Sequence, residues 1–140
     1  MGALILATIS KNVTGEYTME HSFNLEVSDV KNNDFEVDGF LESFPLWNKQ
    51  KMQNGWLFLP ENEFQFSGSV HACLGHILSE FANEIHDLCM RYNSVTLRIA
   101  SFYSPEKIMV VTADLPEPLI KDMAERGLSL ELSFFPTEDN

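Results

Sequence analysis

The chain has 140 residues, which suits one domain and leaves too little for two of ordinary size. Hydrophobic types make up 44% and charged types 21% of the sequence, so disordered and fibrous classes are excluded. Asp and Glu total 21 against 9 Lys and Arg, a formal charge of −12. This charge argues against binding to nucleic acid or anionic membranes and favours a basic macromolecular partner.

Two strands are expected near the N-terminus. Residues 4–9 are apolar. No Lys or Arg precedes them, as it would in a secretory signal, and the run is too short to cross a bilayer. These residues therefore predict the first strand. Residues 23–27 alternate between apolar and polar types and predict a half-buried strand. We expect it to pair with the first strand across a turn at Gly15.

A short helix is predicted after Asn33, because Asn33 and Glu36 have the spacing of a capping box and apolar residues follow at helical spacing. Pro45 ends it. Residues 46–55 are polar and predict a loop, and residues 56–59 predict a short strand that ends before Pro60.

The strongest periodic signal lies in residues 70–92. Apolar side chains recur there at steps of three and four residues and predict one long amphipathic helix that covers a sheet. Ser67 or Ser69 is expected to cap its start.

Two strands are predicted after this helix. Residues 95–103 alternate and predict a strand, and residues 108–112 predict its antiparallel partner after a turn. Asp114 is expected to cap a last helix that ends at Gly127 in the left-handed conformation.

Residues 128–134 alternate cleanly and predict a final strand with one buried face. The order is β-β-α-β-α-β-β-α-β, which predicts an α+β domain over residues 1–135 with a largely antiparallel sheet covered by helices. Residues 136–140 are expected to be a frayed tail.

The two cysteines are expected to be reduced. In one helix, the Cα atoms of Cys73 and Cys89 would lie about 24 Å apart, whereas a disulfide requires roughly 7 Å or less. Reduced thiols favour a cytoplasmic location. Their places at the edges of the apolar stripe indicate small packing residues, although His76 is spaced to contact Cys73.

The histidines do not have the spacing of metal ligands. His71, His76 and His86 are separated by five and ten residues, so no two of them share a helix face at close range. We expect these three residues and His21 to lie at the surface or rim. Glycine-rich phosphate loops and the G-x-S-x-G and H-E-x-x-H motifs are missing, and residues 32–39 lack the closing glutamate of a calcium loop. No cofactor, metal or catalytic residue is therefore assigned.

One segment has a local charge bias that suggests a partner surface. Within residues 29–42, five carboxylates are opposed only by Lys31. These carboxylates form either a solvated helix face or a patch that binds a basic protein. The two nearby tryptophans are either anchors for that partner or residues of the core. The candidate partner-binding residues are Asp29, Asp34, Glu36, Asp38, Glu42, Trp47 and Trp56.

The pattern from residue 23 to residue 134 resembles a bacterial domain-of-unknown-function family. The resemblance rests on the strand at 23–27, the helix that ends in Ser43-Phe44-Pro45, the Gly55-Trp56 step, the long helix and the final helix and strand. It implies a fold and no catalytic residues. In size, acidity and lack of catalytic motifs, the chain is also similar to immunity proteins of contact-dependent inhibition systems.

Three functions follow as hypotheses. The first is a non-catalytic, cytoplasmic immunity protein that covers the active site of a basic nuclease-type toxin. The second is an enzyme or small-ligand protein with a pocket between the sheet and the long helix, where His76, Cys73 or carboxylates would act. The third is a self-associating structural module.

Overall fold

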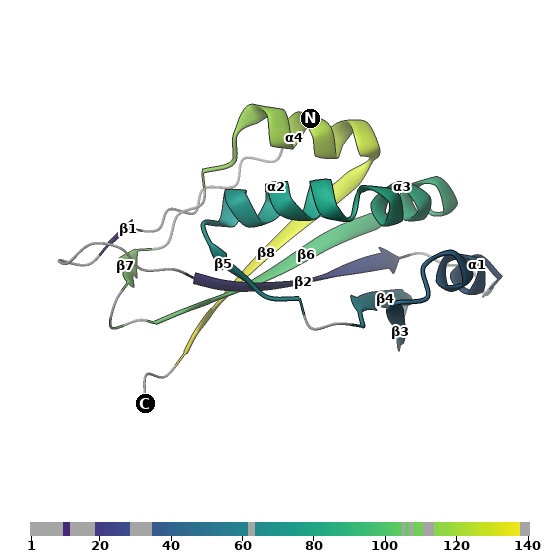
Figure 1. Ribbon diagram of the computed structural model, residues 1–140, viewed down its shortest axis with the longest axis horizontal. Coiled ribbons are helices and arrows are strands. Elements are labelled where there is room, and N and C mark those ends of the chain that lie inside the picture. The colour runs from purple at the N-terminus through teal and green to yellow at the C-terminus, as the bar shows by residue number, and fades with distance from the viewer. Residues whose placement is uncertain are drawn as a thin grey trace.

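A six-stranded sheet with helices packed on one face forms the centre of the protein (Figure 1). The computed structural model describes residues 10–11, 19–28, 35–61, 64–104, 106, 108–110 and 114–137. The strands of this sheet are β2 (Met19–Ser28), β3 (Trp47–Met52), β4 (Gly55–Pro60), β5 (Phe66–Gly68), β6 (Val95–Tyr103) and β8 (Leu128–Pro136). The predicted α+β class is confirmed.

The sheet runs in the order β3-β4-β2-β6-β8, and β5 pairs with the first residues of β2. Every pairing in it is antiparallel except that of β6 with β8, which is parallel. The parallel pair requires a crossover connection, and the last helix lies within that connection. The prediction of a largely antiparallel sheet is therefore confirmed.

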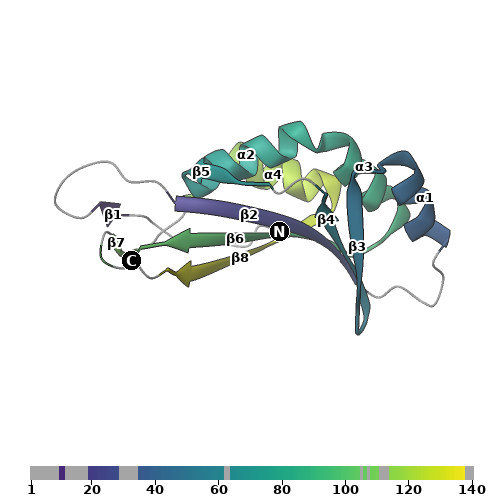
Figure 2. The ribbon, with the colours of Figure 1, turned by 60° about the horizontal axis from the view of Figure 1, so that its bottom comes forward.

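The two faces of the sheet differ in burial. Along β2 the side chains alternate strictly, with Phe23, Leu25 and Val27 buried and the residues between them partly exposed. β6 alternates in the same way over residues 95–101. Figure 2 shows the helices on one side of the curved sheet, where the buried side chains form the core. The alternation in the sequence predicted both strands correctly.

Four helices are described: α1 (Phe35–Ser43), α2 (Val70–Glu80), α3 (Ala82–Arg91) and α4 (Glu117–Arg126). The predicted cap of α2 is confirmed, because the Ser69 hydroxyl accepts a hydrogen bond from the Ala72 N–H at 3.2 Å. Gly127 ends α4 in the left-handed conformation, with φ 73° and ψ 27°. The start of α4 was predicted incorrectly, because Pro116 and not Asp114 occupies the cap position and no side chain caps it.

The predicted single helix over 70–92 is two helices, α2 and α3, separated at Phe81. Phe81 has φ −110° and ψ 28°, outside the helical region. Its backbone N–H still donates to the Ile77 carbonyl at 2.9 Å, and its carbonyl accepts from the Ile85 N–H at 3.0 Å. The two apolar stripes therefore continue across the break, which explains why the periodicity alone does not reveal it.

The predicted loop at 46–55 is largely a strand. Residues of β3 pair with β4 from Trp47 opposite Pro60 to Met52 opposite Gly55. β3 is an edge strand, and its middle residues are exposed. Polar and lysine side chains are common on such edges because they discourage pairing with other chains. This composition hides the strand from a search for alternating hydrophobic residues.

The predicted pairing of the strand at 108–112 with the strand at 95–103 is wrong. β7 (Ile108–Val110) pairs with β1 (Ser10–Lys11) in a separate two-stranded sheet, and both edges of β6 are occupied by β2 and β8. The edges of β2 are likewise taken, by β6 on one side and by β4 and β5 on the other. The predicted strand at 4–9 and turn at Gly15 lie outside the described residues.

The C-terminal strand is longer than predicted. Pro136 pairs with Tyr103 as the last residue of β8, and the Thr137 N–H donates to the Tyr103 carbonyl at 2.7 Å. The strand therefore extends beyond residue 135, and the rest of the predicted tail, residues 138–140, lies outside the described residues. A strand can end in proline here because the missing N–H falls at the end of the ladder.

Candidate functional site

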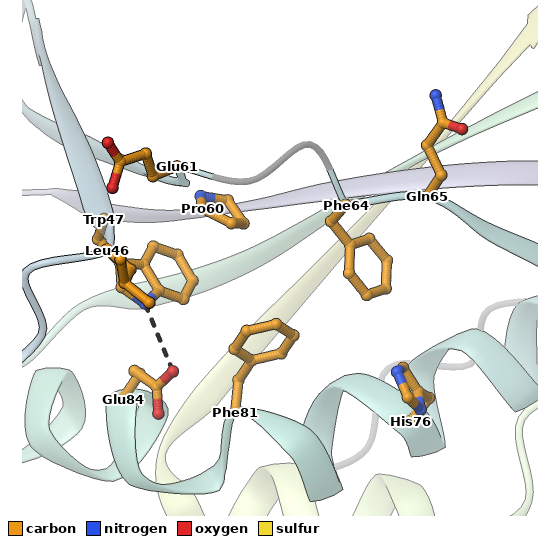
Figure 3. Close-up of a pocket in the computed structure, with 9 residues that line it drawn as sticks. All are labelled: Leu46, Trp47, Pro60, Glu61, Phe64, Gln65, His76, Phe81 and Glu84. Atoms are coloured by element: carbon orange, nitrogen blue, oxygen red, sulfur yellow. Dashed lines mark hydrogen bonds between the residues drawn. The ribbon is translucent and has the colours of Figure 1, made fainter.

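A cavity of about 350 Å³ opens between the helices and the chain that joins β4 to β5. This volume lies within the range of about 300–1,000 Å³ that is typical of ligand pockets. Figure 3 shows Phe64 and Phe81 near its centre, Trp47 and Glu84 together at one end, and His76 at the other. The described residues that line it are Leu46, Trp47, Pro60, Glu61, Phe64, Gln65, His76, Phe81 and Glu84.

Aromatic rings form the inner walls of the cavity. The Phe81 ring lies 5.6 Å from the Trp47 ring at 85° and 5.9 Å from the Phe64 ring at 71°, both edge to face. Phe23, from the buried face of β2, contacts all three rings at centroid distances of 4.7 to 5.9 Å. Edge-to-face packing of this kind fixes the orientation of the rings, so the walls are held in place before any ligand enters.

Two carboxylates give the cavity negative charge. The Trp47 Nε1–H donates to Glu84 Oε2 at 3.4 Å, and the dashed line in Figure 3 marks this bond. Glu84 lies in the first turn of α3, where the helix dipole favours a negative charge. The Glu61 N–H donates to the Leu46 carbonyl at 2.6 Å, which holds these two lining residues together. None of the described lining residues is Lys or Arg.

His76 is the one lining residue that carries an imidazole. Its ring is exposed and lies 6.0 Å from the Phe64 ring at 28° and 5.3 Å from the Phe66 ring at 32°. Cys73, three residues earlier on α2, is fully buried, and burial raises the pKa of its thiol to about 12. A thiol with this pKa is protonated at neutral pH, so Cys73 is a poor nucleophile.

The position of the cavity matches the second functional hypothesis, which placed a pocket between the sheet and the long helix. Of the residues and residue types named for it, His76 and the carboxylates of Glu61 and Glu84 line the cavity, and Cys73 is not among the described lining residues. Cys89 is also free and half-buried, and burial raises the pKa of its thiol while Arg126 lowers it in part.

The predicted acidic patch is only partly described. Asp29 and Asp34 lie outside the described residues, and Glu36 lies in α1 without a described side chain. Asp38 and Glu42 are exposed on α1. Asp38 forms an ion pair with Lys49 of β3 at 3.4 Å, so a basic side chain of this protein already offsets part of the patch.

The two tryptophans named as candidate anchors for a partner are buried. Trp47 is 6% exposed and Trp56 is 9% exposed, and both belong to the hydrophobic core, as the alternative interpretation expected. The ammonium groups of Lys49 and Lys51 lie 4.9 and 4.7 Å from the centroid of the Trp56 ring. This ring is therefore covered by the protein's own cations.

A buried serine–histidine pair was not found from the sequence. His21 is 1% exposed, contrary to the prediction of a surface residue, and its Nδ1 lies 2.7 Å from the hydroxyl of Ser101, which is fully buried. Its Nε2 lies 2.8 Å from the Gly68 carbonyl. Such a pair resembles a nucleophile and its base, but with no exposed surface on Ser101 it joins strands and offers no access to a substrate.

The remaining histidines, His71, His76 and His86, are exposed as predicted. Within the described part of the chain, no three His, Cys, Asp or Glu side chains are grouped so that they could hold a metal ion. In the same residues, none of the helices has the length and apolar character needed to span a bilayer.

No family model, curated protein or solved structure matches the chain. The resemblances to a domain-of-unknown-function family and to immunity proteins therefore remain predictions.

Most of the cavity was missed by sequence analysis. Phe64 and Glu61 lie outside every predicted element, and Phe81 was assigned to the buried stripe of a continuous helix. One signal was present: directly after a predicted strand, the segment from 61 to 66 holds two acidic residues followed by two aromatic residues. Across the cavity, Phe81 and Glu84 are again an aromatic and an acidic residue. They are three residues apart, a spacing that places two side chains of a predicted helix on one face.

Proposed function

We propose that the protein is a non-catalytic binding protein for a basic protein partner, and that this partner is a nuclease-type toxin domain. In this proposal the protein is a cytoplasmic immunity protein, and its acidic surface covers the basic face on which the toxin would hold nucleic acid. Binding by a surface of opposite charge speeds encounter and rejects anionic competitors.

The observation that carries the proposal is an imbalance in charge pairing. All six Lys and Arg side chains that the structure describes contact a carboxylate or the Trp56 ring of the same chain, at ion-pair distances of 2.6 to 4.0 Å or above the ring. Glu42, Glu61, Glu80 and Glu84, in contrast, have no ion pair with a described residue. The six described cations are thus used internally, and these four carboxylates have no described cation of the protein as a partner, which leaves them for an external cation.

The apolar side chain at the cavity mouth adds support. Leu46 is 62% exposed. Its carbonyl accepts a hydrogen bond from the Glu61 N–H, so the two residues lie side by side. Protein interfaces combine an apolar contact with a polar rim in this way. Glu61, Leu46 and Glu84 therefore form the part of the surface that we assign to the partner.

The test is co-expression with the product of the gene directly upstream, where a toxin gene would lie. We expect a stable complex that abolishes the nuclease activity of the partner at equimolar ratio. Calorimetry should show that the affinity falls by at least about tenfold between low and moderately high salt, because paired surface charges are screened. Absence of a complex, or a complex that leaves the nuclease fully active, would refute the proposal.

A pair of matched variants locates the interface. The double variant Glu61→Lys/Glu84→Lys should weaken the complex by at least about a hundredfold, because it reverses both cavity charges. The control, Glu117→Lys/Glu125→Lys, makes the same change in net charge on α4, whose residues do not line the cavity. Equal losses for the two variants would show that only net charge matters and not this surface.

The cavity favours a second candidate, a protein that binds a small organic ligand. Its volume of about 350 Å³ and its aromatic walls suit such a ligand, whereas the first candidate requires only the rim. Screening the apo protein by thermal shift against uncharged organic compounds would distinguish the two, since a saturable stabilisation by a neutral ligand without a protein partner is expected only from the second.

A further inference from the structure

We propose that the aromatic cavity is a receptor for one arginine side chain of the partner, with its guanidinium against the walls formed by the Trp47, Phe64 and Phe81 rings and Glu84 as its counter-ion. This inference rests on the proposed function for the source of the arginine, but the recognition of the cation is a property of the cavity alone. It adds a defined pocket for one side chain to the acidic surface that binds the partner in the proposed function.

The walls have the chemistry that a guanidinium prefers. A cation within about 6 Å of an aromatic centroid is attracted by the ring quadrupole, and arginine makes this contact more often than lysine. A planar guanidinium can stack on a ring and at the same time donate in its own plane to a carboxylate. The Glu84 carboxylate, held beside Trp47 by the indole N–H, is placed to accept such bonds.

The comparison between the two tryptophans supports an external cation. At Trp56 the protein supplies two ammonium groups of its own, 4.9 and 4.7 Å from the ring centroid. At Trp47, Phe64 and Phe81, in contrast, none of the described residues that line the cavity is Lys or Arg, although an indole ring and two carboxylates are present. The attraction between a cation and an indole ring is thus satisfied by the protein's own lysines at Trp56 and is left to an external cation at Trp47.

The cavity is also organised in advance. Phe23 lies behind the three wall rings and packs against each of them, and it is only 5% exposed. A ligand that enters therefore does not have to order the walls, which lowers the entropic cost of binding. The exposed Leu46 at the mouth can cover the methylene groups of an arginine whose head lies inside.

The experiment uses the two indole N–H resonances of the chain as separate probes. Trp47 Nε1–H contacts Glu84 at the cavity, whereas the Trp56 indole nitrogen is buried without a hydrogen-bond partner among the described residues and does not line it. The ¹⁵N-labelled apo protein is titrated with Nα-acetyl-arginine methylamide, and a Trp56→Phe variant assigns the two peaks. We expect the Trp47 peak to move and saturate at millimolar ligand, and the Trp56 peak to stay in place.

Two ligand controls define the chemistry. The neutral isostere Nα-acetyl-citrulline methylamide should cause no saturable shift, and the acetyl-lysine methylamide should bind at least about threefold more weakly than the arginine compound. Equal binding of citrulline would overturn the cation site, and equal or tighter binding of lysine would overturn the choice of arginine.

Two variants define the residues. Glu84→Gln keeps the shape of the side chain and should weaken binding of the arginine compound by at least about fivefold. Glu80→Gln removes the same charge one turn earlier, from an exposed residue that does not line the cavity, and should change binding less than twofold. Equal effects of the two would overturn the role of Glu84, and Phe64→Leu tests the walls independently of charge.

The last arm separates this inference from the proposed function. If the partner binds but Glu84→Gln leaves its affinity unchanged, the arginine pocket is wrong and the proposed function stands. If the arginine compound binds and no basic partner does, the cavity takes a free organic cation and both the protein-borne source and the proposed function fail. The dissociation constant of so small a ligand is expected to lie below about 50 mM. If the arginine compound does not bind at that concentration, the pocket is refuted directly.

Discussion

The imidazole of His21 bridges Ser101 and Gly68, residues that lie 80 and 47 positions away in the chain. The Gly68 carbonyl can only accept a hydrogen bond, so His21 Nε2 must carry the proton. In the neutral ring Nδ1 then accepts from the Ser101 hydroxyl. This single side chain joins β2 to both β5 and β6.

Stability is therefore expected to depend on pH through His21. Burial lowers the pKa of His21 below its ordinary value of 6.5, while the Gly68 hydrogen bond and the charge of Glu20 oppose that shift. The unfolded chain consequently takes up a proton at a higher pH than the folded one. The contribution of the neutral ring is complete above pH 6.5 and is lost as the pH falls below that value towards the lower folded-state pKa.

Urea unfolding between pH 8 and pH 5 measures this effect. His86→Gln, which removes an exposed imidazole, should keep the decline of the wild type. His21→Leu should be less stable throughout but should have a flatter profile over this range. Parallel profiles for wild type and His21→Leu would show that His21 does not cause the pH dependence.

Removing the hydroxyl that His21 uses should also destabilise the protein. Ser101→Ala leaves a buried Nδ1 without a donor, and such a loss is worth about 1–3 kcal/mol in the free energy of unfolding. Ser129→Ala, on the exposed side of β8, should stay within about 0.5 kcal/mol of wild type. Chemical denaturation at pH 8 compares the two, and an unchanged midpoint for Ser101→Ala would contradict the bridge.

Gly55 is expected to tolerate no side chain. A Cβ atom built on Gly55 would lie 1.9 Å from the Val27 carbonyl oxygen, and backbone cannot move away as a flexible side chain can. Gly55→Ala should therefore lower the free energy of unfolding by more than about 3 kcal/mol or prevent folding. The matched control is Gly75→Ala in α2, whose Cβ would make only an ordinary contact at 3.9 Å to Leu119. That change should stabilise by about 0.5–1 kcal/mol, because alanine is the better helix former.

The elements with strict local periodicity were predictable, and those that depend on distant contacts were not. Alternation indicated β2, β6 and β8, because burial on one face of a sheet imposes a period of two on any strand. β3 escaped detection because an edge strand with exposed lysines has no such period. The pairing of β7 with β1 depends on which edges of the large sheet are already filled, which no local pattern records.

The candidate site shows the same division. The sequence indicated an acidic protein without catalytic motifs, and a pocket between the sheet and the long helix was one of three functional hypotheses. The sequence did not indicate that Phe64 and Glu61, from an irregular segment, would meet Phe81 and Glu84 at a helix break. The break has no glycine or proline as a signal, and it coincides with the packing of Phe81 against rings from three other segments. Such tertiary packing overrides helix propensity, and a single sequence does not contain it explicitly.

The two thiols should differ from ordinary cysteines in their reactivity. Burial raises the pKa of Cys73 to about 12 and raises that of the half-buried Cys89 as well. In the folded protein at pH 8, Ellman's reagent should label both cysteines more slowly than it labels an ordinary exposed thiol, and Cys73 should be the slower of the two. In urea both should react at once. Rapid labelling of Cys73 in the native protein, with Cys89→Ser as background, would contradict its buried position.

Phe81 should be the most sensitive position of the cavity, because its ring connects the walls to the core. Its centroid lies 5.0 Å from Phe23, 5.6 Å from Trp47 and 5.9 Å from Phe64. Phe81→Ala removes all three contacts and should lower the free energy of unfolding by about 2–4 kcal/mol, somewhat less than for a fully buried ring. The Trp47 indole resonance should move strongly while that of Trp56 changes little, because only Trp47 touches the lost ring. Met90→Ala, at a side chain that is 75% exposed, is the control and should stay within about 0.5 kcal/mol of wild type. If Phe81→Ala were as stable as Met90→Ala, the ring would not hold the cavity walls, and the helix break at this residue would need another cause.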